Sequence, residues 1–480
     1  MKNKIKNDSG FVLIAVLVLG TLFIVLAGGL ASVSLFQNRL YIQEVAKHQA
    51  INVAEAGVNY YRWHLSHVQN DYMDGTGSDP GGSGEPYGPY LHNFTLDGAV
   101  TGKFSLEITP PPTGSTIVRI KSTGWLDSNP KIKRTIEVRY GLPSLAHFSF
   151  LTNSDTWFGT EESIVGEMHS NGGIRMDGNN DSIITSARQN FTCPSGFTCG
   201  SQATCTTPCS WIATSSSCQC PGIFGIGANS SLWNYPVPSI DFDSVTMVLS
   251  DMESNAGVHL TTSGSNKGYH IIFKNNGHFD AKVVSSLKTS QSQLNDAWTA
   301  YVNFADEINS EGSATDYVIP SNGLIFVSDG DVWVEGEVNG RVTLGAGTFP
   351  DNSNKRRSIY IINNLTYVSR DGSNSLGLLA QKHVKVLKSA PTNLTIDGIL
   401  LAQNGRVFRN SYQNTAVKAK IEVYGGIISN QTWNWTWVSG NTVVDGYAST
   451  TSIYDPNVTY APPPSFPTSG EYSFISWEEK

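Results

Sequence analysis

Six cysteines lie close together in this 480-residue chain, and their spacing indicates disulfide chemistry. They follow the pattern C-x5-C-x5-C-x3-C-x8-C-x-C, an even and clustered set of the kind that forms disulfides in an oxidising compartment. A zinc site would favour paired C-x-x-C knuckles, which this pattern lacks. The spacing alone leaves the pairing open. The disulfide candidates are Cys193, Cys199, Cys205, Cys209, Cys218 and Cys220.

Basic residues gather between Arg341 and Lys420, where twelve lysines and arginines stand against three acids, although the chain as a whole carries a net charge of −8. Such side chains could line one face and follow a phosphate backbone, so the segment is a candidate for binding DNA or another polyanion. The plain alternative is a solvated surface. The DNA-binding candidates are Arg341, Lys355, Arg356, Arg357, Arg370, Lys382, Lys385, Lys388, Arg406 and Arg409.

Three tryptophans alternate at Trp433, Trp435 and Trp437. A strand would place all three indoles on one face, because successive side chains point to opposite sides. Such a face could stack bases or sugar rings, and the alternative is a packed edge of the core.

Signatures of enzymes are missing: the chain has no G-x-S-x-G elbow, no H-E-x-x-H pair and no P-loop. We therefore expect no enzymatic activity, no catalytic residue, no cofactor and no metal. The stretch from Asp177 to Asp181 begins like a calcium loop, but Ser182 stands where glycine is needed and Arg188 where the bidentate glutamate should be.

The chain carries these residues behind an N-terminal segment that contains an apolar run. Lys2, Lys4 and Lys6 precede it, and Thr21 is the only polar side chain from Phe11 to Ala31. About 20 such residues span a bilayer as a helix. The lysines should stay in the cytoplasm, which predicts a single-pass inner-membrane segment with the C-terminus outside. A secretory signal has a shorter apolar core, and a plain membrane anchor is the remaining alternative.

The helix should continue beyond the membrane, because apolar residues recur every three or four positions. A continuous helix from Phe11 to His67 would be about 85 Å long, with residues 11–36 in the membrane. The predicted stripe consists of Ile42, Val45, Ala46, Ala50, Val53, Ala54, Gly57, Val58, Tyr61 and Leu65.

The boundary Ser9-Gly10-Phe11, between a basic leader and the apolar helix, resembles the type IV prepilin signal. The resemblance implies that a prepilin peptidase cleaves after Gly10 and that Phe11 becomes the methylated N-terminus. The segment NVAEAGVNYYRWHL, residues 52–65, is similar to the corresponding segment of PilX-type minor pilins. Major pilins usually carry glutamate at the fifth mature residue, where this chain has Ala15. Alanine in place of this glutamate implies a subunit at the tip of the filament or one that initiates it. The alternative is a neutral substitution within a membrane helix.

Beyond residue 145, short alternating strands are separated by Asn-Gly, Asp-Gly and Gly-Gly turns, which favours an irregular β-solenoid. The phrases DVWVEGEVNGRVTLGAG, LGLLAQ and YDP, with the ending PPPSFPTSGEYSFISWEE, resemble a bacterial family of large pilus-associated solenoid proteins. A DNA-uptake pilin with a solenoid inserted into its pilin domain belongs to that family.

The expected fold class is an α+β pilin-like domain, a long helix plus a small antiparallel sheet, with a large inserted all-β domain. The expected domains are a leader at 1–10, the helix at 11–67, a linker and β-meander at 68–144, a solenoid insert at 145–445 and a C-terminal segment at 446–480. The insert holds the cysteine-rich excursion at 190–222, and the C-terminal segment should return a strand to the pilin sheet. Helices are also expected at Asp241–Ala256 and Gln291–Asn309.

These expectations together indicate a minor pilin-like subunit at or near the tip of a type IV pilus, presenting a head that binds DNA for uptake. The alternatives are a tip adhesin for glycans or surfaces and a K-type pseudopilin of type II secretion. Expected partners are other pilins, the prepilin peptidase, the inner membrane before assembly, and extracellular DNA or glycans. The final location would be the surface pilus.

Overall fold

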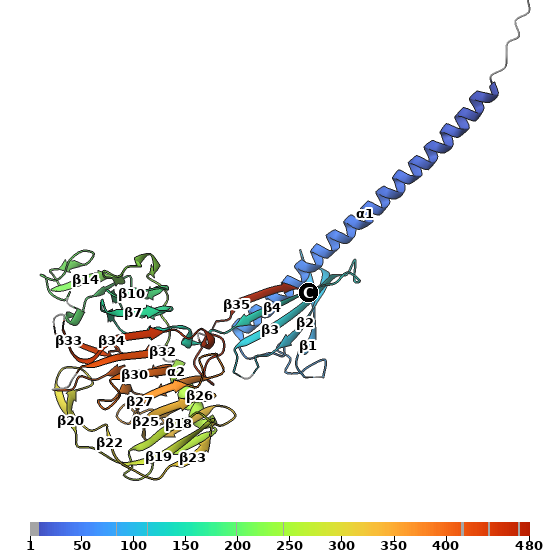
Figure 1. Cartoon of the computed structure of the whole chain (residues 1–480). Coiled ribbons are helices and arrows are strands. Elements are labelled where there is room, and N and C mark those ends of the chain that lie inside the picture. Colours follow the sequence, from blue (N-terminus) through green and yellow to red (C-terminus); the bar gives the residue numbers. More distant parts are fainter. Residues whose placement is uncertain are drawn as a thin grey trace, which may run out of the picture. The chain divides into compact units, whose positions relative to one another are not determined.

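A computed structural model describes residues 9–82, 84–112, 114–197, 199–242, 244–413, 417–439, 442–468 and 471–480, with side chains from residue 11 and without those of 244–247. The chain has a long N-terminal helix followed by a large region built almost entirely of β-strands (Figure 1). It divides into two compact units. The first comprises Met1–Pro111, Ile117–Gly141 and Tyr472–Lys480, and the second comprises Pro112–Thr116 and Leu142–Glu471.

The first unit is organised around α1, which runs from Ser9 to His67 and is 59 residues long, or about 88 Å at the helical rise. Its two halves differ. The predicted stripe is buried from Ala46 to Leu65, but Ile42 is half exposed, because the sheet that covers the stripe does not reach that far.

Five antiparallel strands cover the second half of α1, in the order β1-β2-β3-β4-β35. The strands are β1 (Tyr87–Leu96), β2 (Ala99–Thr109), β3 (Ile117–Leu126), β4 (Arg134–Gly141) and β35 (Ser473–Glu479). Phe104, Leu106 and Ile108 alternate along β2 and pack toward the helix, as period-two patterning requires. β1 begins at Tyr87, within the range 68–144 expected to hold a linker and a β-meander.

The second unit contains parallel strands that stack in register. One ladder runs β17-β24-β26-β28-β30-β32-β5-β8-β11-β16. Its strands are β17 (Val258–Thr261), β24 (Leu324–Ser328), β26 (Arg341–Gly347), β28 (Ser375–Ala380), β30 (Asn393–Ala402), β32 (Lys418–Ser429), β5 (Phe150–Thr152), β8 (Met168–Ser170), β11 (Ile184–Ser186) and β16 (Trp233–Asn234).

Two further sets of parallel pairings lie beside this ladder. One set joins β18-β25-β27-β29-β31 and, separately, β6-β9-β15. The other joins the far ends of β25, β27, β30 and β32 to β34, β7 and β10. The added strands are β18 (Gly268–Lys274), β25 (Asp331–Val338), β27 (Ile359–Tyr367), β29 (Val384–Val386), β31 (Val407–Arg409), β6 (Thr156–Phe158), β9 (Ile174–Met176), β15 (Ile223–Phe224), β34 (Thr442–Ile453), β7 (Glu162–Val165) and β10 (Asn179–Asn180).

Two long strands that take part in two ladders, β30 and β32, bend at a glycine between the two paired stretches. Gly398 of β30 and Gly425 of β32 are paired in register and have φ angles of +151° and +139°, a region that other residues rarely adopt. A side chain on Gly425 would also meet the backbone of Gly398. The bend is therefore repeated from one strand to the next.

Both faces of the first ladder are covered. Leu376 and Leu378 of β28 pack into the interior cluster, while Leu379 packs with Met252 of α2 (Ser244–Asn255) in a second cluster. Strands buried on both sides are expected to read as continuous apolar runs, and β28, SLGLLA, is buried at all six residues.

Antiparallel strands extend the second unit. β19 (His278–Leu287) pairs with β18 on one side and with β22 (Ile308–Glu311) and β23 (Thr315–Val318) on the other. β33 (Thr436–Ser439) pairs with β34.

The prediction of a helix at Gln291–Asn309 is wrong. β20 (Gln291–Leu294) and β21 (Tyr301–Phe304) form a hairpin there, because Asn295 accepts a hydrogen bond from the Thr299 amide at 2.9 Å and closes a turn.

The cysteine-rich excursion has a sheet of its own. It consists of β12 (Asn190–Thr192), β14 (Ser217–Pro221) and β13 (Ser210–Ile212) in that order. Short 3-10 helices occur at Leu145–His147, Ser195–Phe197, Ser230–Leu232 and Pro456–Val458.

Candidate functional site

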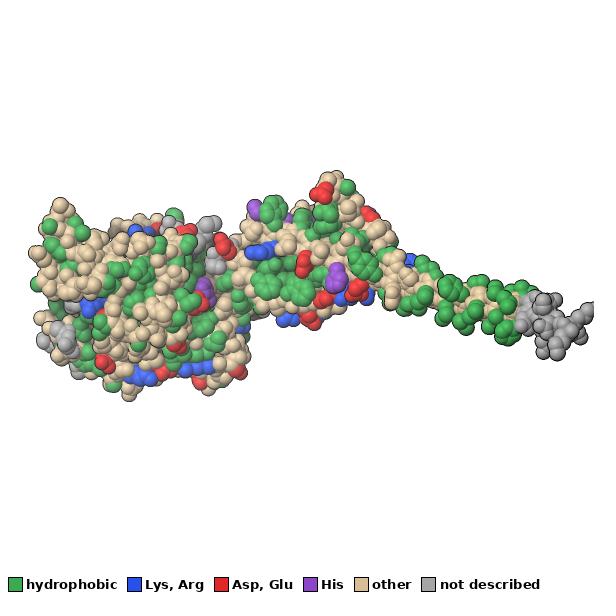
Figure 2. Space-filling model, turned by 90° about the horizontal axis from the view of Figure 1, so that it is seen from above, with side chains coloured by type: hydrophobic (Ala, Val, Ile, Leu, Met, Phe, Trp, Pro, Cys, Tyr) green, Lys and Arg blue, Asp and Glu red, His purple; other side chains and the backbone are tan. Residues whose placement is uncertain are grey.

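The first candidate site is the uncovered half of α1. Side chains from Phe11 to Phe36 stand away from the sheet, and Phe11 itself is 77% exposed. Figure 2 shows hydrophobic side chains along the part of the helix that projects from the sheet. Among the described residues, one helix, Phe11–His67, is long and apolar enough to cross a membrane. So large an apolar surface indicates a membrane or another subunit as its partner.

The predicted processing residues lie at the start of this surface. Gly10 belongs to the helical backbone and Phe11 follows it, while residues 1–8 of the predicted leader lie outside the described residues. Ala15 stands one turn further along the helix. The position at which the prepilin resemblance would place a glutamate therefore holds a methyl group.

The six cysteines are joined as three disulfides, and the structure supplies the pairing that spacing left open. The bridges are Cys193–Cys199, Cys205–Cys218 and Cys209–Cys220. They pack with Phe191, Phe197 and Phe224 into a small core, so the excursion from 190 to 222 has an apolar centre of its own.

Two of the predicted DNA-binding residues are inside the protein. Lys385 is 4% exposed and binds Asp306, and Arg409 is fully buried with its Nη1 2.8 Å from Asp445 Oδ1. Neither can contact DNA at the surface. The prediction failed for these two because β29 and β31 turn both side chains toward acids from other parts of the chain.

Most of the other predicted DNA-binding residues also contact groups of the protein itself. Arg356 forms two hydrogen bonds with Asp351, Arg370 pairs with Asp397 and Glu422, and Lys382 pairs with Asp296. Arg341 donates to the backbone oxygens of Ala461 and Pro462, Arg357 donates to Thr348, and Arg406 lies over the Trp298 ring at 4.0 Å. Lys355 is exposed, and Lys388 is half-buried beside Tyr412.

The local excess of positive charge is therefore partly balanced in three dimensions. Asp296, Asp306, Glu422 and Asp445 all lie outside the segment 341–420 in sequence, yet their carboxylates contact its cations. Counting charges along the sequence could not include them.

The three tryptophans pack instead of presenting a stacking face. Trp433 and Trp435 are buried in the interior cluster, and Trp433 donates to Thr156 Oγ1 at 2.9 Å. Trp437 is half-buried, donates to the Arg409 carbonyl and contacts Trp298. The packed-edge interpretation describes their positions, because their indole faces contact protein.

The first acid of the segment that begins like a calcium loop, Asp177, is hydrogen-bonded within the protein. Asp177 accepts hydrogen bonds from Trp157 Nε1 at 2.9 Å, from Arg175 Nε at 2.7 Å and from the Ile226 amide. Both of its carboxylate oxygens therefore already have protein donors.

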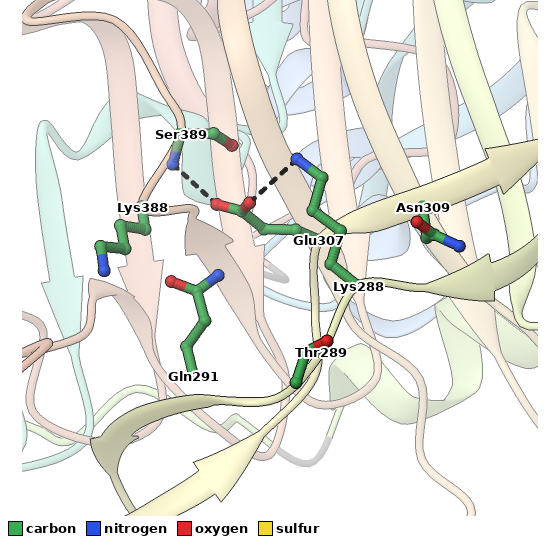
Figure 3. A pocket seen from close by; sticks show the side chains of 7 residues that line it. All are labelled: Lys288, Thr289, Gln291, Glu307, Asn309, Lys388 and Ser389. Carbon is green, nitrogen blue, oxygen red and sulfur yellow. Dashed lines mark hydrogen bonds and ion pairs between the residues drawn. The ribbon is translucent and has the colours of Figure 1, made fainter.

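A polar cavity of about 580 Å³ lies between β19, β22 and the end of β29 (Figure 3). Sequence reasoning did not find it, because its residues come from two distant segments. Glu307 is largely buried and connects the two segments: its carboxylate lies 3.4 Å from Lys288 Nζ and accepts a hydrogen bond from the Ser389 amide at 3.0 Å. The cavity is lined by Lys288, Thr289, Gln291, Glu307, Asn309, Lys388 and Ser389.

Comparisons with known proteins add a likeness to solved structures. No family model matches the sequence, and no curated protein matches it either. Among solved structures the chain is similar to a pilin, the competence-associated pilin ComZ from Thermus thermophilus. The match has 11% identity and a TM-score of 0.33 and covers 91% of this chain and 97% of that one. A TM-score of this size is too low to carry function from that protein to this chain.

Proposed function

We propose that this chain is a pilin-like subunit of a type IV pilus, a minor subunit at or near the filament tip that carries a β-solenoid head. The observation that carries the proposal is the division of α1 into two halves. Its second half is covered by an antiparallel sheet, and its first half is apolar and uncovered over more than 20 residues. Such a helix can lie first in a bilayer and later among the helices of neighbouring subunits.

Processing is the first part of the proposal to test. A helix that leaves the membrane for a filament needs its basic leader removed, and Gly10 gives a peptidase close access to the backbone. The intact mass of the protein purified from its native cells should correspond to a chain that begins at methylated Phe11. A chain that still begins at Met1, or that begins beyond Ala31, would contradict the proposal.

The tip position rests on Ala15. A glutamate at this depth in the membrane half would need a partner cation, and a subunit with no subunit above it has none to use. Labelling of the head on isolated pili by immunoelectron microscopy should mark filament ends. Regular labelling along the shaft would contradict the tip position, and recovery only with a secretion complex would favour the pseudopilin alternative.

The head is proposed to present DNA. The polar cavity supports this because Lys288 and Lys388 flank a group of hydroxyl and amide donors, and a single carboxylate, Glu307, pairs with Lys288. Replacing Lys288 and Lys388 by glutamine should weaken DNA retention and reduce its salt dependence, by about 0.9 in the logarithmic slope for each phosphate that is no longer neutralised. Lys121→Gln, in the first unit, is the matched control. Salt-independent retention, or binding of an acidic glycan but not DNA, would favour the adhesin alternative.

A further inference from the structure

A buried lysine in the second unit touches both a carboxamide and a carboxylate. The Nζ of Lys385, in β29, donates to Gln293 Oε1 in β20 and lies 2.5 Å from Asp306 Oδ2. All three side chains are almost fully buried. Hydrogen bonds of this kind would satisfy an ordinary buried ion pair, but a carboxamide beside a lysine amine is also an acyl donor beside a nucleophile.

The hydrogen bonds arrange these groups for one reaction. Asp306 Oδ2 contacts the lysine nitrogen and also accepts from Gln293 Nε2 at 3.1 Å, so a single carboxylate oxygen reaches both the attacking and the leaving nitrogen. Asn410 Nδ2 donates to Gln293 Oε1 at 2.9 Å. A donor at this oxygen polarises the carbonyl and stabilises the negative charge that develops when a nucleophile adds.

The amine of Lys385 is shielded from water and lies among aromatic rings. The rings of Phe304, Phe408 and Tyr412 lie 5.6 to 5.8 Å from the nitrogen of Lys385. Burial lowers the pKa of Lys385, and the charge of Arg409 lowers it further, against the opposing effect of Asp306. A larger fraction of the amine is therefore unprotonated and able to attack.

We propose that Lys385 and Gln293 become joined by an intramolecular isopeptide bond, with Asp306 as the catalytic residue. The neutral amine of Lys385 attacks Cδ of Gln293, and Asp306 takes a proton from the attacking nitrogen. Asp306 then gives that proton to the carboxamide nitrogen as the carbon–nitrogen bond of the carboxamide breaks. Ammonia leaves, a secondary amide remains, and no oxidant, reductant or other reactant is needed.

The bond would join two parts of the second unit that are 92 residues apart in sequence. β20 belongs to the two-stranded hairpin β20–β21, and β29 belongs to the parallel ladder β18-β25-β27-β29-β31. A covalent link at this point would keep the hairpin on the ladder when the head is pulled. The bond would form in the second unit whether or not the chain belongs to a pilus.

Mass spectrometry of the full-length protein tests the proposal directly. The intact mass, corrected for the N-terminus found and for three disulfides, should be lower than the sequence mass by one ammonia. A lysine-specific protease should fail to cut after Lys385, and one peptide should contain Lys385 and Gln293 joined. The full sequence mass with normal cleavage after Lys385 would overturn the proposal, as would loss of water with a link to Asp306.

Matched variants test the role of the carboxylate. Asp306→Asn keeps the size of the side chain but removes the proton carrier, and this chain should show the full mass and separate peptides. Glu307→Gln changes the neighbouring carboxylate, which touches neither reacting atom, and should leave the link intact. A link that persists in Asp306→Asn would overturn the role of Asp306. If that variant does not fold, the mass of the wild-type protein still decides whether the bond forms.

Discussion

Gly124 of β3 lies backbone against backbone with Ala54 of α1. A Cβ atom at Gly124 would be 2.3 Å from the Ala54 nitrogen and 2.5 Å from the Ala50 oxygen. The helix has a matching glycine, because a Cβ atom at Gly57 would be 2.4 Å from Ser122 Oγ. The two glycines, one on each surface, allow the helix and the sheet to approach more closely than side chains would permit.

Replacing Gly124 by valine should therefore loosen α1 from its sheet. Overpacking a close contact costs about 1–3 kcal/mol, and here the neighbour that would have to move is helix backbone. Hydrogen exchange of peptides covering residues 46–65 should become faster. Gly159→Val is the control, because nothing lies near the added side chain there. Equal exchange in both variants would show that the close approach is not needed.

The three disulfides should hold the excursion independently of the parallel ladders. Removing the Cys205–Cys218 bridge by serine substitution at both positions should destabilise the excursion by about 2–4 kcal/mol, since a disulfide restricts the unfolded chain. Limited proteolysis should then cut between residues 194 and 217 while the remainder of the second unit stays intact. General proteolysis of the second unit would mean that the excursion supports the ladders.

Acid should weaken the second unit through His169. Burial lowers the pKa of His169 below 6.5, a hydrogen bond with Asn171 opposes this, and the nearby His147 lowers it further. The unfolded chain then binds more protons than the folded one, so the stability contribution is complete above pH 6.5 and decreases as pH falls below it. His169→Gln should flatten the dependence of the unfolding temperature on pH below 6.5, whereas exposed His48→Gln should not.

The buried pair of Arg409 and Asp445 should matter far more than the outer pair of Arg356 and Asp351. Asp445→Asn leaves an arginine charge buried without its partner and should cost about 3–5 kcal/mol of unfolding free energy. Asp351→Asn breaks a partly exposed pair and should cost about 0–1 kcal/mol. Urea denaturation of both variants measures the difference. Equal losses would contradict the assignment of Arg409 as a structural residue.

Local sequence patterns predicted the helices and strands better than they predicted which side chains contact one another. The apolar run and the stripe from Ala46 to Leu65 lie on one helix, because helical periodicity records which face is buried. The phrase LGLLAQ contains a buried strand for a similar reason. The interval from Gln291 to Asn309 had helical spacing, yet its Asn295 turn and its pairing with distant strands produced a hairpin.

The candidate sites depended on contacts that no local pattern contains. Lys385 looked like a surface cation in sequence, and its acid and amide partners lie 79 and 92 residues away. Glu307 and Ser389 meet at the cavity across 82 residues. Clustering did identify the cysteines as disulfide candidates, but their pairing required the fold.

The fifth strand of the helix-covering sheet has a consequence for how the subunit is made. β35 pairs with β4, and Ser473 bonds to Gly141, which lies 332 positions earlier in the chain. Until β35 has been synthesised, β4 presents an unpaired edge, and such edges invite pairing with other chains. The sheet therefore gains its last strand only after the second unit has been synthesised, so a chain cut short within the second unit would leave the edge of β4 open.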